Sequence, residues 1–123
     1  NKISFYTLMK FKEKENRPWG TFYVIHDELN YKLKRIEVNP NSRLSYQYHS
    51  KRSECWTIVQ GSGLITIDGD EIQISQGESV TIKQGSKHRI YNNTSDSLVF
   101  IEVQTGSYFG EDDIIRIEDD YNR

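Results

Sequence analysis

The feature that most constrains the fold is a regular succession of short β-forming runs separated by turn residues. From Trp19 onward, apolar and polar residues alternate with period two, which is typical of half-buried strands. Roughly nine or ten such runs follow one another without a long amphipathic helix between them, which predicts an all-β sandwich or barrel. The runs cover residues 21–26, 31–38, 43–48, 55–60, 64–67, 72–74, 79–82, 87–91, 98–104 and 114–117.

The length of the chain limits it to one domain. Because 123 residues leave no room for a second core, we expect a single domain over residues 17–123. Residues 1–16 are expected to form an N-terminal arm, and their charged second half is typical of a solvated arm or a short helix. Cys55 is the single cysteine, which excludes an internal disulfide and fits a reducing cytoplasm.

The charge pattern argues against two classes of partner. The net charge is −2, and the 16 Lys and Arg residues are spread along the chain, whereas a nucleic-acid binder carries a clustered basic patch. The sequence has no run of about 20 apolar residues and no apolar signal-peptide centre in residues 1–16. We therefore expect neither nucleic acid nor membrane as a partner, and we expect a cytoplasmic location.

A candidate metal site combines polar residues from three of the predicted runs. Gln47 and His49 are two apart in one strand, so both side chains point to the same face. Glu54 opens the next strand, and His88 lies near the start of a later one. This set of N and O donors suits Zn²⁺ first and also Mn²⁺, Co²⁺, Fe²⁺ or Ni²⁺, with open positions left for substrate because no thiolate is present. Spacing alone favours the alternative that the two histidines are ordinary surface or core residues.

The glycines around these residues complete two longer motifs. The chain reads Gln47-x-His49-x4-Glu54-x6-Gly61 and then Gly77-x5-Lys83-x-Gly85-x2-His88-x3-Asn92. This pattern resembles the two cupin motifs, with Gln47 in a position that usually holds His and Lys83 in one that usually holds Pro. The resemblance implies a double-stranded β-helix, a jelly-roll barrel with the metal inside one mouth.

Further segments extend the match beyond these motifs. They are residues 17–20, 34–36, 43–49, 52–56, 85–89 and 101–116. Together they resemble the type II mannose-6-phosphate isomerase family over residues 17–123, a cupin module that is often the C-terminal half of a bifunctional enzyme with a mannose-1-phosphate guanylyltransferase half. In that family an amide is the usual ligand at the position of Gln47. Residues 1–16 contain no Gly-rich nucleotide-binding loop, so we expect a stand-alone module.

The family resemblance implies an activity. It implies metal-dependent interconversion of mannose 6-phosphate and fructose 6-phosphate, in carbohydrate metabolism that feeds polysaccharide biosynthesis, by a homodimer. The chain departs from the family at Ser50, Lys51, Cys55 and Asn122. These departures keep two alternatives open: an isomerase or epimerase for another sugar phosphate or nucleotide sugar, and a non-catalytic cupin that binds a sugar or a metal.

The isomerisation needs a base and a stabilised enediolate oxygen, and it brings further residues into consideration. Glu102, Glu111 and Asp112 are candidates for the base. Glu102 could equally support a ligand histidine from behind, and the acidic tail residues could be plain solvated surface. Lys34 shares strand parity with Ile36 and is expected to point inward toward an anion, with an edge-strand lysine as the alternative.

Contacts to the substrate need cations and flat apolar surfaces. Arginine suits a phosphate group through its planar fork, and an aromatic ring can stack on a sugar. The candidates, each of which could also be ordinary surface or core, are Arg17, Arg52, Trp56, Arg89, Tyr108 and Arg116.

Overall fold

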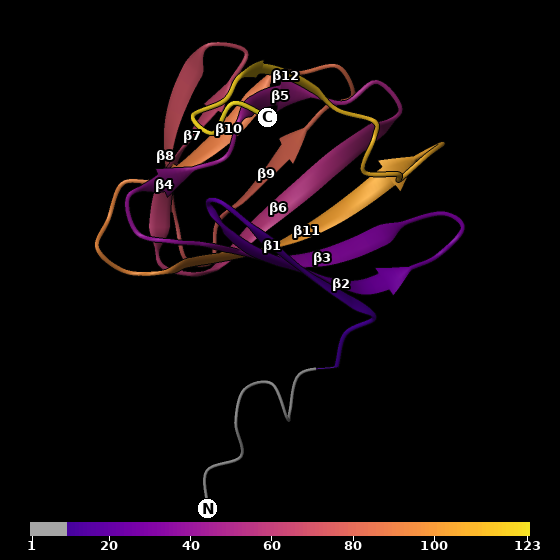
Figure 1. The fold of residues 1–123 in the computed structure, drawn as a ribbon, viewed down its shortest axis with the longest axis horizontal. Helices are drawn as coiled ribbons and strands as arrows, with labels where there is room; N and C mark the ends of the chain where they lie inside the picture. Colours follow the sequence, from indigo (N-terminus) through magenta and orange to yellow (C-terminus); the bar gives the residue numbers. More distant parts are fainter. Residues whose placement is uncertain (1–9) are drawn as a thin grey trace, which may run out of the picture.

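The computed structural model describes residues 10–123, which form strands and turns and contain no helix (Figure 1). The prediction of an all-β fold is thereby confirmed. The strands are β1 (Glu13–Arg17), β2 (Gly20–Asp27), β3 (Lys32–Val38), β4 (Ser42–Arg43), β5 (Tyr46–Tyr48), β6 (Arg52–Gln60), β7 (Ser62–Ile67), β8 (Asp70–Ser75), β9 (Ser79–Ile82), β10 (His88–Asn92), β11 (Leu98–Gly106) and β12 (Ile115–Glu118).

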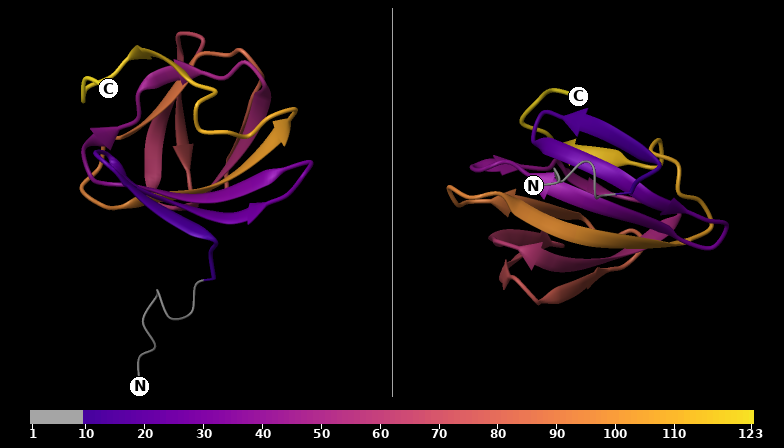
Figure 2. Two further views of the ribbon diagram at one scale, coloured as in Figure 1. Left: turned by 45° about the vertical axis from the view of Figure 1, so that its right-hand side comes forward. Right: turned by 90° about the horizontal axis from the view of Figure 1, so that it is seen from below.

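The strands form two antiparallel sheets. The first has the order β1-β2-β3-β11-β6-β9, and the second has the order β12-β5-β10-β7-β8, with β4 paired to β10. The sheets curve around a common interior, and strands far apart in the sequence, such as β3, β11 and β6, lie side by side (Figures 1 and 2). This order brings the metal-site strands β5, β6 and β10 to the same interior from different sheets.

Strand alternation divides that interior into an apolar and a polar end. On β3, β11 and β6 the cross-strand partners Ile36, Phe100 and Ile58 point inward and are buried in the main hydrophobic cluster. Two residues further along β11, and two back along β3 and β6, the inward row carries polar groups, because Glu102 pairs with Lys34 on one side and with Trp56 on the other. The inward-facing polar rows mark the end of the barrel where a site can form.

Some boundaries differ from those that the sequence predicts. Residues 13–16 were expected in a solvated arm or a short helix, but they belong to strand β1, which pairs with β2 along the edge of the first sheet. The rest of the arm over residues 1–9 lies outside the described residues. The predicted strand over 43–48 is divided into β4 and β5, and β6 begins at Arg52, three residues before the predicted run over 55–60. The described part of the chain has no helix that is long and apolar enough to cross a membrane.

Candidate metal centre and barrel pocket

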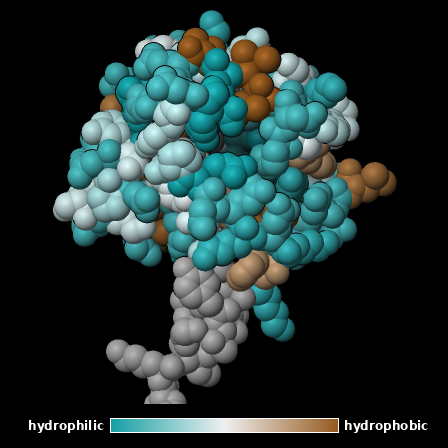
Figure 3. Space-filling view, in the orientation of Figure 1, coloured by the Kyte–Doolittle hydropathy of each residue, from teal (hydrophilic) through white to brown (hydrophobic). Residues whose placement is uncertain are grey.

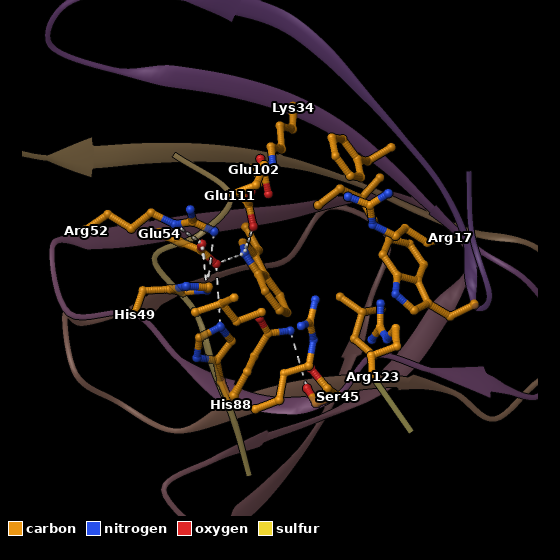
Figure 4. Close-up of a pocket in the computed structure, with 18 residues that line it drawn as sticks. Arg17, Lys34, Ser45, His49, Arg52, Glu54, His88, Glu102, Glu111 and Arg123 are labelled. Atoms are coloured by element: carbon orange, nitrogen blue, oxygen red, sulfur yellow. Dashed lines mark hydrogen bonds and ion pairs between the residues drawn. The ribbon is translucent and has the colours of Figure 1, made fainter. Parts of the chain in front are cut away.

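The polar end of the barrel holds a pocket that both sheets line. In the space-filling view the surface is hollowed near its centre, and the rim of this hollow is hydrophilic (Figure 3). The close-up shows charged side chains converging on the pocket from opposite sides (Figure 4). The lining residues are Arg17, Trp19, Phe22, Lys34, Ile36, Leu44, Ser45, Gln47, His49, Arg52, Glu54, Trp56, His88, Glu102, Glu111, Ile114, Arg116 and Arg123.

His49, Glu54 and His88 meet inside this pocket. All three are buried, and their potential ligand atoms lie within 4.8 Å of one another. His49 Nε2 is 3.3 Å from Glu54 Oε2, and His88 Nε2 is 3.6 Å from Glu54 Oε1. Tetrahedral ligands at bond lengths near 2.1 Å are separated by about 3.4 Å, so these spacings fit a divalent cation such as Zn²⁺.

Backbone carbonyls fix the tautomer of both histidines. The Nδ1 atom of His49 lies 2.6 Å from the carbonyl oxygen of Asp113, and that of His88 lies 2.9 Å from the carbonyl oxygen of Ser86. A carbonyl oxygen can only accept, so Nδ1 carries the proton and Nε2 keeps its lone pair for a metal. Burial lowers the pKa of both rings, for His49 to about 4, which keeps them neutral as metal ligands must be.

Gln47 joins the same group through strand pairing. It lies opposite His88 in the register of β5 and β10, and it lines the pocket. Its amide nitrogen donates to the carbonyl oxygen of Ser45 at 3.4 Å, which leaves the amide oxygen as a potential ligand. The structure therefore brings all four predicted metal-site residues to one pocket.

Arg52 lies beside the metal ligands rather than at the far side of the pocket. Its Nε donates to Glu54 Oε2 at 2.8 Å, and its Nη2 lies 3.3 Å from His49 Nε2. Burial opposes the charge of Arg52, but the carboxylates of Glu54 and Glu102 hold its pKa above the ordinary value. Arg52 thus orients the Glu54 carboxylate and adds a positive charge next to the site.

Glu102 is a buried carboxyl group on β11, opposite Trp56 of β6. Trp56 Nε1 donates to Glu102 Oε1 at 2.9 Å, and Gln104 Nε2 donates to Glu102 Oε2 at 2.7 Å. Burial, together with the negative charge of Glu54, raises the pKa of Glu102 to about 7. A carboxyl group with this pKa can accept and release a proton near neutral pH.

Lys34 and Glu111 form an ion pair across the pocket mouth. Lys34 is buried on the same face as Ile36, as strand parity predicts, and its Nζ donates to the carboxylate of Glu111. Lys32 Nζ lies 3.4 Å from the same oxygen. Burial would raise the pKa of Glu111, but the two lysines outweigh it and lower this pKa to about 2. The tail segment around Glu111 is therefore tied to β3.

Three arginines line the opposite part of the pocket. Arg17 and Arg116 are among the predicted substrate-binding residues, and the structure places both in the lining. Arg123 joins them; it ends a string, Tyr121-Asn122-Arg123, that resembles the terminal Tyr-Gly-Arg of the family, but it was not among the predicted site residues. Its position depends on the turn at residues 119–123, where Arg123 Nε donates to Asp119 Oδ2 at 3.0 Å.

Three predicted site residues lie outside the pocket lining. Asp112, a candidate base, accepts a hydrogen bond from the hydroxyl of Tyr108, and both side chains are exposed. Arg89 follows His88 and points to the other face of β10, where its Nε donates to the carbonyl oxygen of Leu44 at 3.0 Å and its Nη1 donates to Glu118 at 2.9 Å. Strand alternation explains the position of Arg89, and a local surface hydrogen bond explains those of Asp112 and Tyr108.

Comparisons with known proteins identify the family of the chain. Residues 6–119 match the family model described as the C-terminal region of mannose-6-phosphate isomerase. A mannose-1-phosphate guanylyltransferase of Escherichia coli is 40% identical over 107 residues, which are 87% of this chain and 23% of that protein. The xanthan biosynthesis protein XanB of Xanthomonas campestris is 41% identical over 110 residues, which are 89% of this chain and 24% of that protein. The chain thus spans about a quarter of the length of these curated relatives.

A solved structure identifies the fold. An uncharacterized conserved protein with a double-stranded β-helix domain from Klebsiella pneumoniae superposes with a TM-score of 0.69 at 16% identity, covering 78% of this chain and 82% of that one. The two packed sheets are therefore a double-stranded β-helix, as the cupin motifs imply.

Proposed function

Because this chain belongs to the family of the mannose-6-phosphate isomerase C-terminal region, we propose that it is a metal-dependent isomerase that interconverts mannose 6-phosphate and fructose 6-phosphate. One observation carries the proposal. His49, Glu54 and His88 converge on one point of a polar pocket, and the buried carboxyl group of Glu102 lies in the same lining. A Lewis-acid site beside a proton-transfer group is the combination that aldose–ketose isomerisation needs.

The metal would be held by Nε2 of both histidines, the carboxylate of Glu54 and the amide oxygen of Gln47. This donor set suits Zn²⁺ first, and Mn²⁺, Co²⁺, Fe²⁺ or Ni²⁺ as alternatives. When bound, the cation supplies stabilisation for the negative oxygen that develops as a proton leaves the carbon next to the carbonyl. Arg52 keeps the Glu54 carboxylate oriented through its hydrogen bond to Oε2.

Glu102 is the residue that we assign to proton transfer between C1 and C2. Its raised pKa matches the task, and hydrogen bonds from Trp56 and Gln104 fix both oxygens of the carboxyl group. Lys34 lies next to Glu102 in the register of β3 and β11, where it can offset negative charge on the substrate. Glu111 holds the Lys34 ammonium in place from the tail.

The pocket also offers polar atoms for sugar hydroxyl groups. The buried atoms Ser45 Oγ and Arg52 Nη1 have no protein hydrogen-bond partner among residues 10–123. A buried polar group without a partner is costly, and a polyhydroxylated substrate would satisfy both.

Three of the four departures from the family pattern, Ser50, Lys51 and Cys55, lie outside this lining. The backbone N–H groups of Ser50 and Lys51 bind the carboxylate of Asp113, and neither residue lines the pocket. Cys55 is exposed on the outer face of β6. This placement favours mannose 6-phosphate over a different sugar phosphate. We place the reaction in the supply of polysaccharide precursors, a context that the name of XanB supports. The cytoplasmic location and the homodimer stay predictions.

The proposal is tested by a coupled assay on metal-stripped protein. Mannose 6-phosphate is the substrate, and Zn²⁺, Co²⁺ or Mn²⁺ is added back in turn. We expect metal to restore turnover and His88→Ala to lower it by on the order of 100-fold or more. His26→Ala is the matched control, because His26 lies outside the pocket and pairs with the hydroxyl of Tyr31. Absence of turnover with every metal, from protein that is folded by circular dichroism, would remove this function.

A further inference from the structure

The three pocket arginines reach the same space from separate segments. Arg17 ends β1, Arg116 lies on β12, and Arg123 follows the turn at 119–122. In the close-up, Arg17 and Arg123 lie across the pocket from His49 and Glu54 (Figure 4). The pocket thus has a metal-binding side and a guanidinium side.

Two of these guanidinium groups are held in place by carboxylates, and the third is left without one. Arg17 pairs with Glu15 at 2.6 Å, and Arg123 pairs with Asp119 at 3.0 Å. Among residues 10–123, the structure gives Arg116 no hydrogen bond and no ion pair. Partial burial and then the charge of Arg123 lower the pKa of Arg116, while Asp119 opposes this effect and Arg17 adds to it. Gathered like charges of this kind are stabilised by an anion.

A β-bulge keeps acidic charge away from this cluster. In a regular strand, Arg116 and Glu118 would point to the same face. The pairing of β12 with β5 shifts register between these two residues. Arg116 consequently lines the pocket, whereas Glu118 accepts hydrogen bonds from Arg43 and Arg89 outside it.

Strand register also fixes the distance between the metal-binding side and the guanidinium side of the pocket. Arg116 pairs with Gln47 on β5, and Gln47 pairs with His88 on β10. Since neighbouring strands lie about 4.8 Å apart, the backbone of Arg116 is roughly 10 Å from that of His88. A six-carbon sugar phosphate carries its phosphate and its reacting carbons at opposite ends of one chain, which is the arrangement that such a pocket accommodates.

We propose that Arg17, Arg116 and Arg123 form the subsite for the phosphate group of the substrate, with Arg116 as its central contact. The planar forks of several arginines can bind the phosphate oxygens in pairs, and this orients the reacting end of the sugar toward the metal ligands. Arg123 is a specificity residue on this view. The assignment of the ligand as a sugar phosphate rests on the proposed function, but the phosphate contact itself does not require turnover.

Equilibrium binding tests the subsite without relying on activity. Mannose 6-phosphate and mannose are titrated by calorimetry into the metal-stripped full chain, for the wild type and for Arg116→Ala, Arg123→Ala and Arg116→Lys. We expect the wild type to prefer mannose 6-phosphate and each alanine variant to weaken its binding by about 10- to 100-fold, the range for a charge-assisted contact. Arg116→Lys should recover part of the loss. Arg43→Ala is the control, because it removes the same charge outside the pocket.

The outcomes separate this inference from the proposed function. Arginine-dependent preference for mannose 6-phosphate supports the subsite, whether or not the protein turns the sugar over. Unchanged binding in folded Arg116→Ala and Arg123→Ala overturns it, even if the wild type is an active isomerase. Equal binding of mannose and mannose 6-phosphate by the wild type also overturns it.

Discussion

Two backbone carbonyl oxygens determine which ring nitrogen of each buried histidine is free to bind a metal. Asp113 and Ser86 accept the Nδ1 protons of His49 and His88, which leaves both Nε2 atoms aimed at Glu54. At the scale of single residues, the metal centre therefore depends on neighbours that are not ligands themselves.

Asp113 is the positioning residue whose loss is easiest to detect. Its carboxylate accepts hydrogen bonds from the backbone N–H groups of Ser50 at 3.0 Å and Lys51 at 2.9 Å. These bonds anchor the backbone carbonyl group of Asp113, which orients His49. We expect Asp113→Ala to weaken Zn²⁺ binding about tenfold or more, measured by competition with a chromogenic chelator. Asp112→Ala should leave the affinity unchanged, and Asp113→Asn should restore part of it. Wild-type affinity in Asp113→Ala would show that the anchor does not matter.

The ion pair of Glu111 predicts a pH dependence of stability. The pKa of Glu111 is about 2 in the folded protein, below the ordinary value of 4.5, so its contribution is complete above about pH 4.5 and is lost as pH falls toward 2. Because Glu111 is partly exposed, we expect Glu111→Gln to lower the free energy of unfolding by only about 1 kcal/mol at pH 6.5, and by less at pH 3.5. Urea unfolding at both pH values measures this.

A double-variant comparison isolates the cause. In a Lys34→Met background the main partner of Glu111 is gone, so the effect of Glu111→Gln should shrink and vary less with pH. An effect that is equal at the two pH values in the wild-type background would contradict the ion-pair explanation.

At the scale of strands, the alternation of apolar and polar residues predicted much of the site. Alternation alone predicted that Glu54 shares a face with Trp56 and that Lys34 points inward. It also predicted that Gln47 and His49 point the same way, and both line the pocket although β5 ends one residue before His49. Strand β1 was missed because it is a polar edge strand, which carries no apolar alternation to reveal it.

The orientations of several tail residues could not be predicted from the sequence. A one-residue bulge turns Arg116 and Glu118 to different faces of β12, and no residue pattern predicts this bulge. Arg123 reaches the pocket only because the tail crosses the barrel mouth, which is a long-range property of the fold. Asp112 and Tyr108 were included for their place in a family-like string, but the string did not fix their orientation.

The junction of β11 with β6 gives a prediction at this scale. Gly106 has φ +149°, and an added Cβ would lie 2.3 Å from the carbonyl oxygen of Lys51 and 2.8 Å from Cα of Arg52. Gly106→Ala must therefore separate the strands, and we expect it to lower the free energy of unfolding by about 2 kcal/mol or more. Gly77→Ala is the control, since its φ is +89° but nothing lies within 4 Å, so backbone strain of about 1 kcal/mol is its main cost. Equal destabilisation, in urea titrations of both variants, would refute the clash.

At the scale of the whole molecule, two sheets bring ligands together that are up to 41 residues apart in the sequence, from Gln47 to His88. The site consequently exists only in the folded chain, and metal binding should stabilise the fold. At a free Zn²⁺ concentration 100 times its Kd, we expect the free energy of unfolding to rise by about 2.7 kcal/mol. His88→Ala should lose most of this increase in a urea titration, and an equal increase in this variant would place the metal elsewhere.

The central claim is that this barrel moves a proton on a sugar phosphate with the help of its metal site. The most direct measurement follows mannose 6-phosphate in D₂O by proton NMR, with metal-loaded and with metal-stripped protein. The account predicts that the C2 proton signal decays and fructose 6-phosphate appears only when metal is present. If the metal-loaded, folded protein leaves the spectrum unchanged, or if the metal-stripped protein acts equally well, the account is contradicted.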